Sequence, residues 1–223
     1  MKAFGFDFDG TIINIEPEKA RVFGEIVGKY WGVDKGEASD YWHAKGGTSR
    51  RAKFDYFYEK KFKKKLGDDE YKLVEEKFSL RLKKDYYPKI RLLPGALSVL
   101  KFVRANFDFV FVSSGVPLGE IRYLVNLTGL SGYFDLVLGT SKKYLSKKEH
   151  FEEIIKSKKP DLLVYLADGI VDMQIAKELG IISIGIPTNR PVSNLRRAGA
   201  DYISSLSNSI SLIKKLLSTL PES

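Results

Sequence analysis

Short apolar runs alternate with amphipathic stretches over most of this 223-residue chain. This alternation is typical of βαβ units, in which a parallel sheet is buried under helices on both faces. We expect strands at residues 3–6, 109–112, 136–138, 162–166, 181–186 and 201–203. We expect helices at about 95–105, 118–128, 148–157, 170–179 and 208–218.

Residues 14–92 have a different pattern, because Lys, Glu, Tyr and Phe recur there with helical spacing and no convincing strand is found. Pro17 and Pro88 lie near its two borders, where proline favours a break in regular structure. The sequence therefore predicts an α/β fold with a Rossmann-like three-layer core and a mainly parallel sheet. Residues 1–13 and 93–223 would form this core, and residues 14–92 an inserted α-helical cap domain.

Composition removes several classes of protein. There is no cysteine, so disulfides, thiolate metal sites and cysteine nucleophiles are excluded. The two histidines, His43 and His150, are too few for a multi-histidine zinc centre, and we interpret His43 as structural. No apolar run reaches the roughly 18 residues of a membrane helix, and the polar N-terminus does not resemble a signal peptide. We expect a soluble, cytoplasmic protein with no membrane partner.

The formal net charge of +9 is unevenly distributed. Residues 14–92 contain 20 Lys and Arg against 14 Asp and Glu, so most of the excess lies in the predicted insertion. A basic surface can attract nucleic acid or small anionic substrates. The aromatic residues Tyr56, Phe57 and Tyr58 would suit nucleic acid, but their helical spacing favours a place in the core of the insertion. We therefore favour a small anion.

Two carboxylates follow the first predicted strand. Asp7 and Asp9 are two residues apart, so they point to the same side while the backbone stays extended, and Gly10 then allows a turn. Two acids packed together are unfavourable unless a cation lies between them. An acidic exposed turn is the alternative, but the phenylalanines on both sides of Asp7 argue against exposure.

The strand predicted at 109–112 ends in Ser113 and Ser114, followed by a glycine and Pro117. If a helix begins here, its N-terminal N–H groups and the hydroxyls would form an anion site. The simpler alternative is a helix-capping serine.

Lys147 would lie in the first turn of the next predicted helix, with Ser146 and Glu149 as a capping box. The helix dipole disfavours a cation there, which suggests that an anion is bound nearby. A solvated lysine is the alternative.

The strand at 162–166 ends close to Asp168 and Asp172, which share one face if a helix has begun. Ligands of open α/β sheets bind at the carboxyl ends of the strands, so we expect all these groups to meet at one sheet edge. Hard carboxylate oxygens without His or Cys favour Mg²⁺ over zinc. The sequence thus predicts a Mg²⁺ site beside an anion cradle.

These motifs resemble those of the haloacid dehalogenase superfamily, in its phosphatase branch with a helical cap, similar to phosphoglycolate phosphatases. The Asp-x-Asp-Gly-Thr motif is matched from Asp7 to Thr11. The Ser/Thr motif is matched by Ser113, and the lysine motif by Lys147, with Lys148 as a rival. The two aspartates of the usual Gly-Asp-x-x-x-Asp motif are matched by Asp168 and Asp172, and alanine stands where the motif has glycine.

The resemblance implies a Mg²⁺-dependent phosphomonoester hydrolase that forms an aspartyl-phosphate intermediate on a small phosphorylated metabolite. Asp7 would be the nucleophile and Asp9 the general acid and base, protonated in an acidic neighbourhood. Asp7, the main-chain carbonyl of Asp9, and Asp168 would hold Mg²⁺, supported by Asp172. Ser113, Ser114 and Lys147 would hold the phosphoryl oxygens.

Three alternatives remain open. A phosphomutase of the same superfamily would need a cap that excludes water. A phospho-acceptor signalling domain also uses acids, a hydroxyl and a lysine, but the insertion and the order of the motif count against it. A nucleic-acid-binding module has only the charge and the aromatic residues in its favour.

Substrate specificity is expected in the cap. Gly46 and Gly47 permit a tight turn between two predicted helices, and Lys45 and Arg50 flank it. We predict that Lys45 or Arg50 pairs with an anionic group of the substrate; surface charge is the alternative for each.

Overall fold

We analysed a computed structural model that describes residues 1–46 and 48–218. Within this part of the chain, six parallel strands form one sheet in the order β3-β2-β1-β4-β5-β6. The strands are β1 (Lys2–Phe6), β2 (Phe109–Pro117), β3 (Leu136–Thr140), β4 (Leu162–Ala167), β5 (Ile182–Gly185) and β6 (Tyr202–Ile203). The predicted α/β class with a parallel sheet is confirmed.

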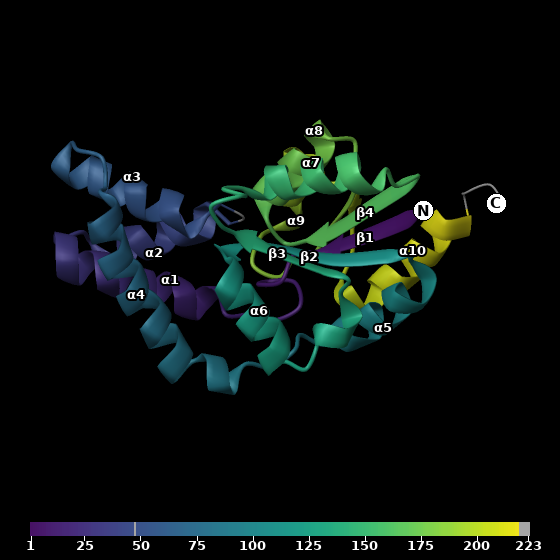
Figure 1. Cartoon of the computed structure of the whole chain (residues 1–223), viewed down its shortest axis with the longest axis horizontal. Helices are drawn as coiled ribbons and strands as arrows, with labels where there is room; N and C mark the ends of the chain where they lie inside the picture. Colours follow the sequence, from purple (N-terminus) through teal and green to yellow (C-terminus); the bar gives the residue numbers. More distant parts are fainter. Residues whose placement is uncertain (47, 219–223) are drawn as a thin grey trace.

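Helices cover both faces of this sheet, which gives three layers (Figure 1). One face carries α5 (Ala96–Asn106), α6 (Leu118–Leu127) and α10 (Leu206–Ser218). The other face carries α7 (Lys147–Lys158), α8 (Ile170–Glu178) and α9 (Val192–Ala198). Among the described helices, none is both long enough and apolar enough to cross a membrane.

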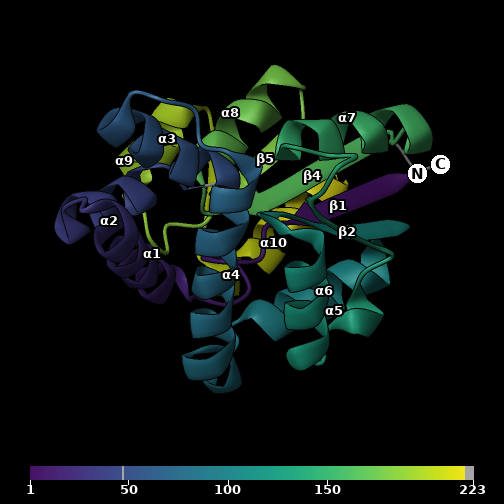
Figure 2. The ribbon, with the colours of Figure 1, turned by 60° about the vertical axis from the view of Figure 1, so that its left-hand side comes forward.

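Four further helices lie beyond the carboxyl ends of the strands (Figures 1 and 2). They are α1 (Glu16–Trp31), α2 (Lys35–Ala44), α3 (Arg50–Phe62) and α4 (Asp68–Asp85), and a short 3₁₀ turn, η1 (Tyr87–Lys89), follows them. Their shared interior is aromatic: Phe23 packs against Trp42, Phe54 and Phe57, with ring centroids 4.9–5.7 Å apart. Phe57 is therefore part of this interior and Tyr58 packs against it, as their helical spacing predicted, but the same prediction is wrong for Tyr56, which is 41% exposed. We call these helices the helical insertion.

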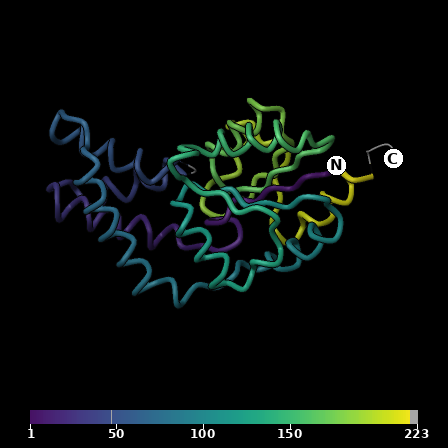
Figure 3. The backbone as a smooth tube through the Cα atoms, in the orientation of Figure 1, coloured from purple at the N-terminus to yellow at the C-terminus, as the bar shows by residue number. Residues whose placement is uncertain are grey.

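The chain enters and leaves the insertion through two segments that lie side by side (Figure 3). Ile13 forms an antiparallel bridge with Leu92, and the N–H of Leu93 donates to the carbonyl of Ile12 at 2.8 Å. The two segments therefore form one joined connection between the sheet and the insertion.

A glycine in β1 allows two aromatic rings from the neighbouring strands to pack over the centre of the sheet. A Cβ on Gly5 would lie within 2.3–2.7 Å of the rings of Phe111 on β2 and Tyr165 on β4. Those two rings are stacked across the glycine with centroids 6.4 Å apart. Because of this packing, the hydroxyl of Tyr165 reaches the sheet edge where the acidic residues lie.

Two details differ from the sequence prediction. Strand β2 does not end at residue 112 but continues to Pro117, because after an irregularity that follows Ser113 the chain pairs with β3 again at Pro117 and Thr140. Helix α9 was not predicted at all; it is short, and Pro191 precedes it directly. The turn expected at Gly46 and Gly47 involves Gly47, which lies outside the described residues.

Candidate active site

Asp7 and Lys147 meet at the carboxyl edge of the sheet. The N–H of Asp7 donates to the carbonyl of Leu166 at 2.9 Å, so Asp7 still follows the direction of β1. Lys147, the first residue of α7, donates from Nζ to Oδ1 of Asp7 at 2.8 Å and to Oδ1 of Asp172 at 2.6 Å. All three side chains are buried. The structure thus holds Asp7 in one place before any ligand binds.

Burial dominates the electrostatics of Asp7. Loss of solvent raises the pKa of Asp7 to about 6, although Lys147 acts in the opposite direction and Asp172 in the same direction. The pKa of Lys147 is raised by Asp172 and Asp7, which outweigh the effect of its own burial. The lysine therefore stays charged and partly offsets two buried carboxylates.

Asp172 is held from two sides. It lies in the first turn of α8, and Asp168 precedes this helix, so the two do not share a helical face as the spacing suggested. The hydroxyl of Tyr165 lies 3.2 Å from Oδ1 of Asp172. Oδ2 of Asp172 is buried and has no hydrogen-bond donor among the described residues.

Asp168 is surrounded by groups from a loop that follows β5. Its Oδ2 accepts from Nη1 of Arg190 at 2.8 Å and from Nδ2 of Asn189 at 3.0 Å. Burial raises the pKa of Asp168 well above its usual value, and Arg190 lowers it in part. On its other side, Asp168 packs against Gly10, where a Cβ would lie 2.3 Å from the carboxylate. Gly10 has φ +79°, as the turn after β1 requires.

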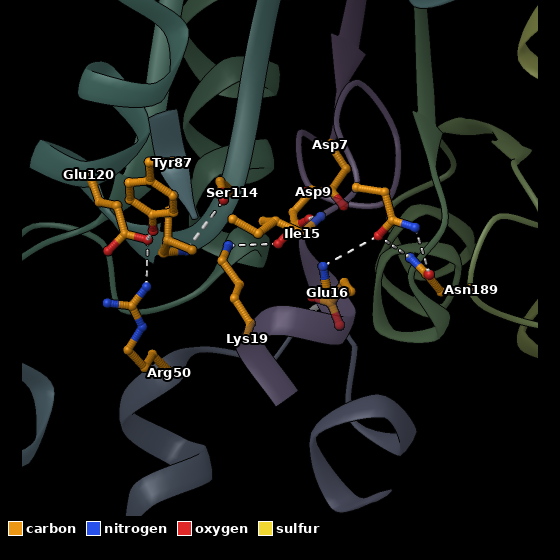
Figure 4. A network of polar contacts seen from close by, with 12 residues as sticks. Asp7, Asp9, Ile15, Glu16, Lys19, Arg50, Tyr87, Ser114, Glu120 and Asn189 are labelled. Carbon is orange, nitrogen blue, oxygen red and sulfur yellow. Dashed lines mark hydrogen bonds and ion pairs between the residues drawn. The ribbon is translucent and has the colours of Figure 1, made fainter. Parts of the chain in front are cut away.

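Asp9 faces the insertion instead of other acids. Its Oδ1 accepts from the N–H of Ile15 at 3.0 Å, and its Oδ2 forms an ion pair with Nζ of Lys19 at 2.6 Å (Figure 4). The expected acidic neighbourhood of Asp9 is therefore wrong in detail, because the charged group nearest to its Oδ2 is an ammonium.

Ser113 and Ser114 point to different surroundings. Oγ of Ser113 lies 2.9 Å from Nδ1 of His150, whose Nε2 lies 3.2 Å from the carbonyl of Gly139. Burial lowers the pKa of His150 to about 4, so its neutral ring accepts the Ser113 proton while Nε2–H donates to Gly139. Ser114 lines the pocket described below. Neither serine begins a helix, since α6 starts only at Leu118.

The two candidate lysines of α7 are clearly separated. Lys147 is buried between carboxylates, whereas Lys148 is half exposed and pairs with Glu178 at the surface. The capping box takes another form, because Glu149 accepts from the N–H of Leu145 at 2.6 Å and Ser146 makes no capping hydrogen bond.

Arg50 is buried and already paired. Its guanidinium donates to Glu75 at 2.6 Å and Ser79 at 2.8 Å on α4, and to Glu120 at 2.6 Å on α6. Tyr87 also donates to Glu120 (Figure 4). The pKa of Glu120 falls to about 2, because Arg50 outweighs the effect of burial. Arg50 therefore joins the insertion to the core, while Lys45 is exposed and does not line the pocket.

These groups enclose a narrow pocket of about 40 Å³ between the sheet edge and the insertion. Its lining includes Lys19, Lys53 and Trp42 from the insertion, and Asp7 and Lys147 from the core. Sequence reasoning missed Lys19, Lys53, Tyr165 and Arg190. Only Lys19 had a local signal, since it lies in the first turn of the helix that follows the Asp-x-Asp segment.

The donor set fits a hard divalent cation. No group of three or more His, Cys, Asp or Glu side chains gathers as a metal cluster in the described ranges. Asp7 and Asp168 nevertheless line one pocket, and burial raises the pKa of both carboxyls despite the cations beside them. Two carboxylates completed by a main-chain carbonyl and water suit Mg²⁺, and the unpaired Oδ2 of Asp172 could accept from such a water.

The sequence matches the family model of haloacid dehalogenase-like hydrolases over residues 1–180. Among curated proteins, none matches. A solved structure described as a phosphoglycolate phosphatase from Haemophilus somnus is 18% identical with a TM-score of 0.75, and the match covers 96% of this chain and 98% of that one.

Two other solved structures are similar over nearly their whole length. A protein from Clostridium acetobutylicum described as a predicted phosphatase is 18% identical with a TM-score of 0.77, covering 97% of this chain and 98% of that one. A protein from Bacteroides vulgatus described as a β-phosphoglucomutase is 18% identical with a TM-score of 0.76, covering 100% and 91%. At these identities the likeness shows the fold.

Proposed function

This chain belongs to the haloacid dehalogenase-like hydrolase family, and we propose that it is a Mg²⁺-dependent phosphatase of small phosphomonoesters that carries the phosphoryl group on Asp7. One observation carries the proposal: Nζ of Lys147 is fixed between Asp7 and Asp172, 2.8 and 2.6 Å away, and Asp7 and Lys147 line one narrow pocket. A buried carboxylate beside an ammonium suits nucleophilic attack on phosphorus, because the ammonium offsets the repulsion between two anions.

Asp7, the main-chain carbonyl of Asp9, and Asp168 would hold Mg²⁺. The metal would supply positive charge that draws the phosphate to Asp7 and stabilises the charge on its equatorial oxygens. In that role Asp168 would turn at least one oxygen away from Arg190 and toward the pocket.

In the first step, Oδ of Asp7 would attack phosphorus and the ester oxygen would leave. Asp9 would give that oxygen a proton, and to carry this proton it would have to leave its ion pair with the Lys19 ammonium. In the second step, Asp9 would take a proton from a water that attacks the phosphoryl group on Asp7. Lys147 and Ser114 would hold phosphoryl oxygens throughout, and Ser113 would join them only if its proton turned away from His150.

We propose that the helical insertion is a cap that closes over the substrate. It supplies Lys19, Lys53 and Trp42 to the pocket and meets the core through the Arg50–Glu120 pair. Substrate entry would then require the insertion to move away from the sheet edge, since the pocket has room for only a few waters.

A phosphomutase is the second candidate. The observation that favours it is the enclosure of Asp7, which lies beneath the insertion with little of its surface exposed. Such enclosure would protect a phosphoryl group on Asp7 from water until it is returned to a sugar. The two candidates differ in whether water or an alcohol accepts that group.

Phosphate release from a panel of phosphorylated metabolites, with Mg²⁺ and with a chelator, tests the proposal. We expect release that needs Mg²⁺, and an acid-stable phosphoryl group on wild-type protein that Asp7→Asn lacks. A stable phosphoprotein with no turnover would indicate a signalling domain. Isomerisation without release would indicate a mutase. Activity that survives complete chelation would contradict metal dependence.

A further inference from the structure

Buried cations are unusually frequent near the pocket. In the described part of the chain they are Lys19, Arg50, Lys53, Lys147 and Arg190, each at most 5% exposed. Four of them form ion pairs with carboxylates, namely with Asp9, Glu120, Asp7 and Asp168. Lys53 is the exception, since its Nζ forms no ion pair and no hydrogen bond among the described residues, and its nearest described contact is the ring of Trp42.

The environment of Lys53 does not compensate for its burial. Its side chain is 3% exposed, and its Nζ lies over the ring of Trp42, 3.8 Å from the centroid. A cation–π contact of this kind contributes only part of what an ammonium loses on leaving water. The pKa of Lys53 is accordingly lowered to about 8, chiefly by burial, with Lys19 and Arg190 acting in the same direction and Glu16 and Asp9 against it.

Lys53 lies in the same pocket as the nucleophile. It is the fourth residue of α3, one turn after Arg50, and it lines the cavity that also contains Asp7 and Lys147. Asp9, Glu120, Asp7 and Asp168 are held by the other four cations, and Glu16, which also lines the pocket, lies 3.6 Å from Arg190. An unpaired buried ammonium that faces a pocket is a binding group for an anion that comes from outside the chain.

We propose that Lys53 binds a second anionic group of the substrate, so that this protein prefers short phosphomonoesters with a carboxylate or a second phosphate near the ester. This inference rests on the proposed phosphatase function. The phosphoryl group would lie at Asp7 and Lys147, and the second group would lie against Lys53 and the edge of Trp42. Because Lys53, Asp7 and Lys147 line one narrow pocket, the two groups should be joined by a short linker.

Arg50 and Lys45 are poorer candidates for this role. Arg50 has Glu75, Glu120 and Ser79 as partners, so binding a substrate anion would mean giving up contacts that join the insertion to the core. Lys45 is exposed outside the pocket. One helical turn therefore separates the structural arginine from the proposed specificity lysine.

The test compares phosphoglycolate with ethyl phosphate, which has a similar size but lacks the second anion, and with ethylene glycol bisphosphate. Wild-type protein should prefer both doubly anionic esters, and the better of the two identifies the second group. A charge-assisted contact predicts that Lys53→Met lowers kcat/KM for the preferred ester about 10–150-fold. Ethyl phosphate and p-nitrophenyl phosphate should change less than about 3-fold. Lys60→Met, an exposed lysine on the same helix, should change neither.

Thermal unfolding distinguishes this role from a structural one. If Lys53 is present for a ligand, Lys53→Met should unfold at the same temperature as wild type or higher, because an unpaired buried charge is removed. Phosphonoacetate carries a carboxylate in addition to its phosphonate, whereas ethylphosphonate carries the phosphonate alone. Phosphonoacetate should therefore raise the unfolding temperature of wild-type protein more than ethylphosphonate does, and Lys53→Met should lose that difference.

The outcomes are separable. If none of these phosphate esters is hydrolysed, the proposed phosphatase function fails. If any is hydrolysed and wild-type protein does not prefer a doubly anionic ester to ethyl phosphate, the assignment of Lys53 is overturned. An equal loss for all esters in Lys53→Met also overturns it. Should that variant not fold, the wild-type preference and the phosphonate comparison still decide.

Discussion

The two walls of the pocket use buried charge in different ways. The floor is formed by Asp7, Asp168, Asp172 and Lys147 on the core. It contains a cation fixed between one carboxylate that follows β1 and another in the first turn of α8. The roof, formed by Lys19, Arg50 and Lys53 on the insertion, directs two cations at carboxylates of the core and leaves the third unpaired. The charged groups of the floor therefore hold one another in place without a ligand. Those of the roof depend on groups outside the roof, either carboxylates of the core or, for Lys53, a ligand.

A substitution of Asp9 should have the largest effect, because Asp9 belongs to the core but forms an ion pair with Lys19 of the roof. Asp9→Asn keeps the main-chain carbonyl and removes the proton carrier. General acid–base help is worth about 10²–10⁴-fold, so hydrolysis of alkyl phosphates should fall by that factor with no burst. An aryl phosphate has a stable leaving group, so its first step should survive and a burst should precede a slow steady rate.

Rapid-quench trapping of the phosphoenzyme measures this directly. Equal slowing for alkyl and aryl substrates with no trapped intermediate would indicate that Asp9 serves folding or metal placement instead.

Lys147 tests the floor alone. Lys147→Gln should lower kcat about 10²–10³-fold, as is typical when a charge-stabilising donor is lost. It should also destabilise the fold by about 3–5 kcal/mol, since Asp7 and Asp172 remain buried without their cation. Lys148→Gln is the matched control, because its side chain pairs with Glu178 at the surface and should matter by less than about 1 kcal/mol. Steady-state kinetics and urea unfolding of both variants give the comparison.

Arg50 tests the attachment of the roof. Arg50→Gln leaves Glu120 and Glu75 without their cation and should cost about 3–5 kcal/mol of stability. Because the pKa of Glu120 is depressed to about 2, this contribution is present above the unfolded value of 4.5 and is lost as the pH falls toward 2. The insertion should also become more sensitive to limited proteolysis. Unchanged stability would mean that the pair does not join the two parts in solution.

His150 contacts Ser113, and its replacement should have the smallest effect of these changes. Its pKa falls from 6.5 to about 4 in the folded protein. The unfolded chain therefore takes up a proton first, and stability is lost as the pH falls from 6.5 to 4. At pH 5 this loss is roughly 2 kcal/mol. Urea unfolding at pH 7 and pH 5 should show a smaller difference in His150→Gln than in wild type; an identical difference would assign the acid sensitivity to other groups.

The sequence predicted the floor better than the roof. Asp7, Lys147, Asp168 and Asp172 each follow a recognisable strand end or open a helix, and parallel topology brings such positions to one edge of the sheet. Their roles remain predictions, but their meeting place follows from local patterns and one topological rule.

The roof could not be predicted in the same way. Arg50 and Lys53 are one turn apart on α3, and nothing local separates them; Glu120, far along the chain on α6, decides which one is paired. The extension of β2 to Pro117 was equally non-local, because Pro117 suits a helix start as well as a strand edge. Its pairing with Thr140 on β3 determines the outcome.

The bridge between Ile13 and Leu92 has a consequence for the modularity of the chain. The chain leaves the core and returns to it at adjacent points. The two ends of the inserted segment therefore lie side by side, and the segment has almost no distance to span. Closing such a loop costs entropy that grows only slowly with its length, so segments of very different size could occupy this place over the same sheet. A short turn from Ile13 to Leu92 would close the core without its roof. Insertions that differ in size could therefore be attached to the same sheet through this single paired junction.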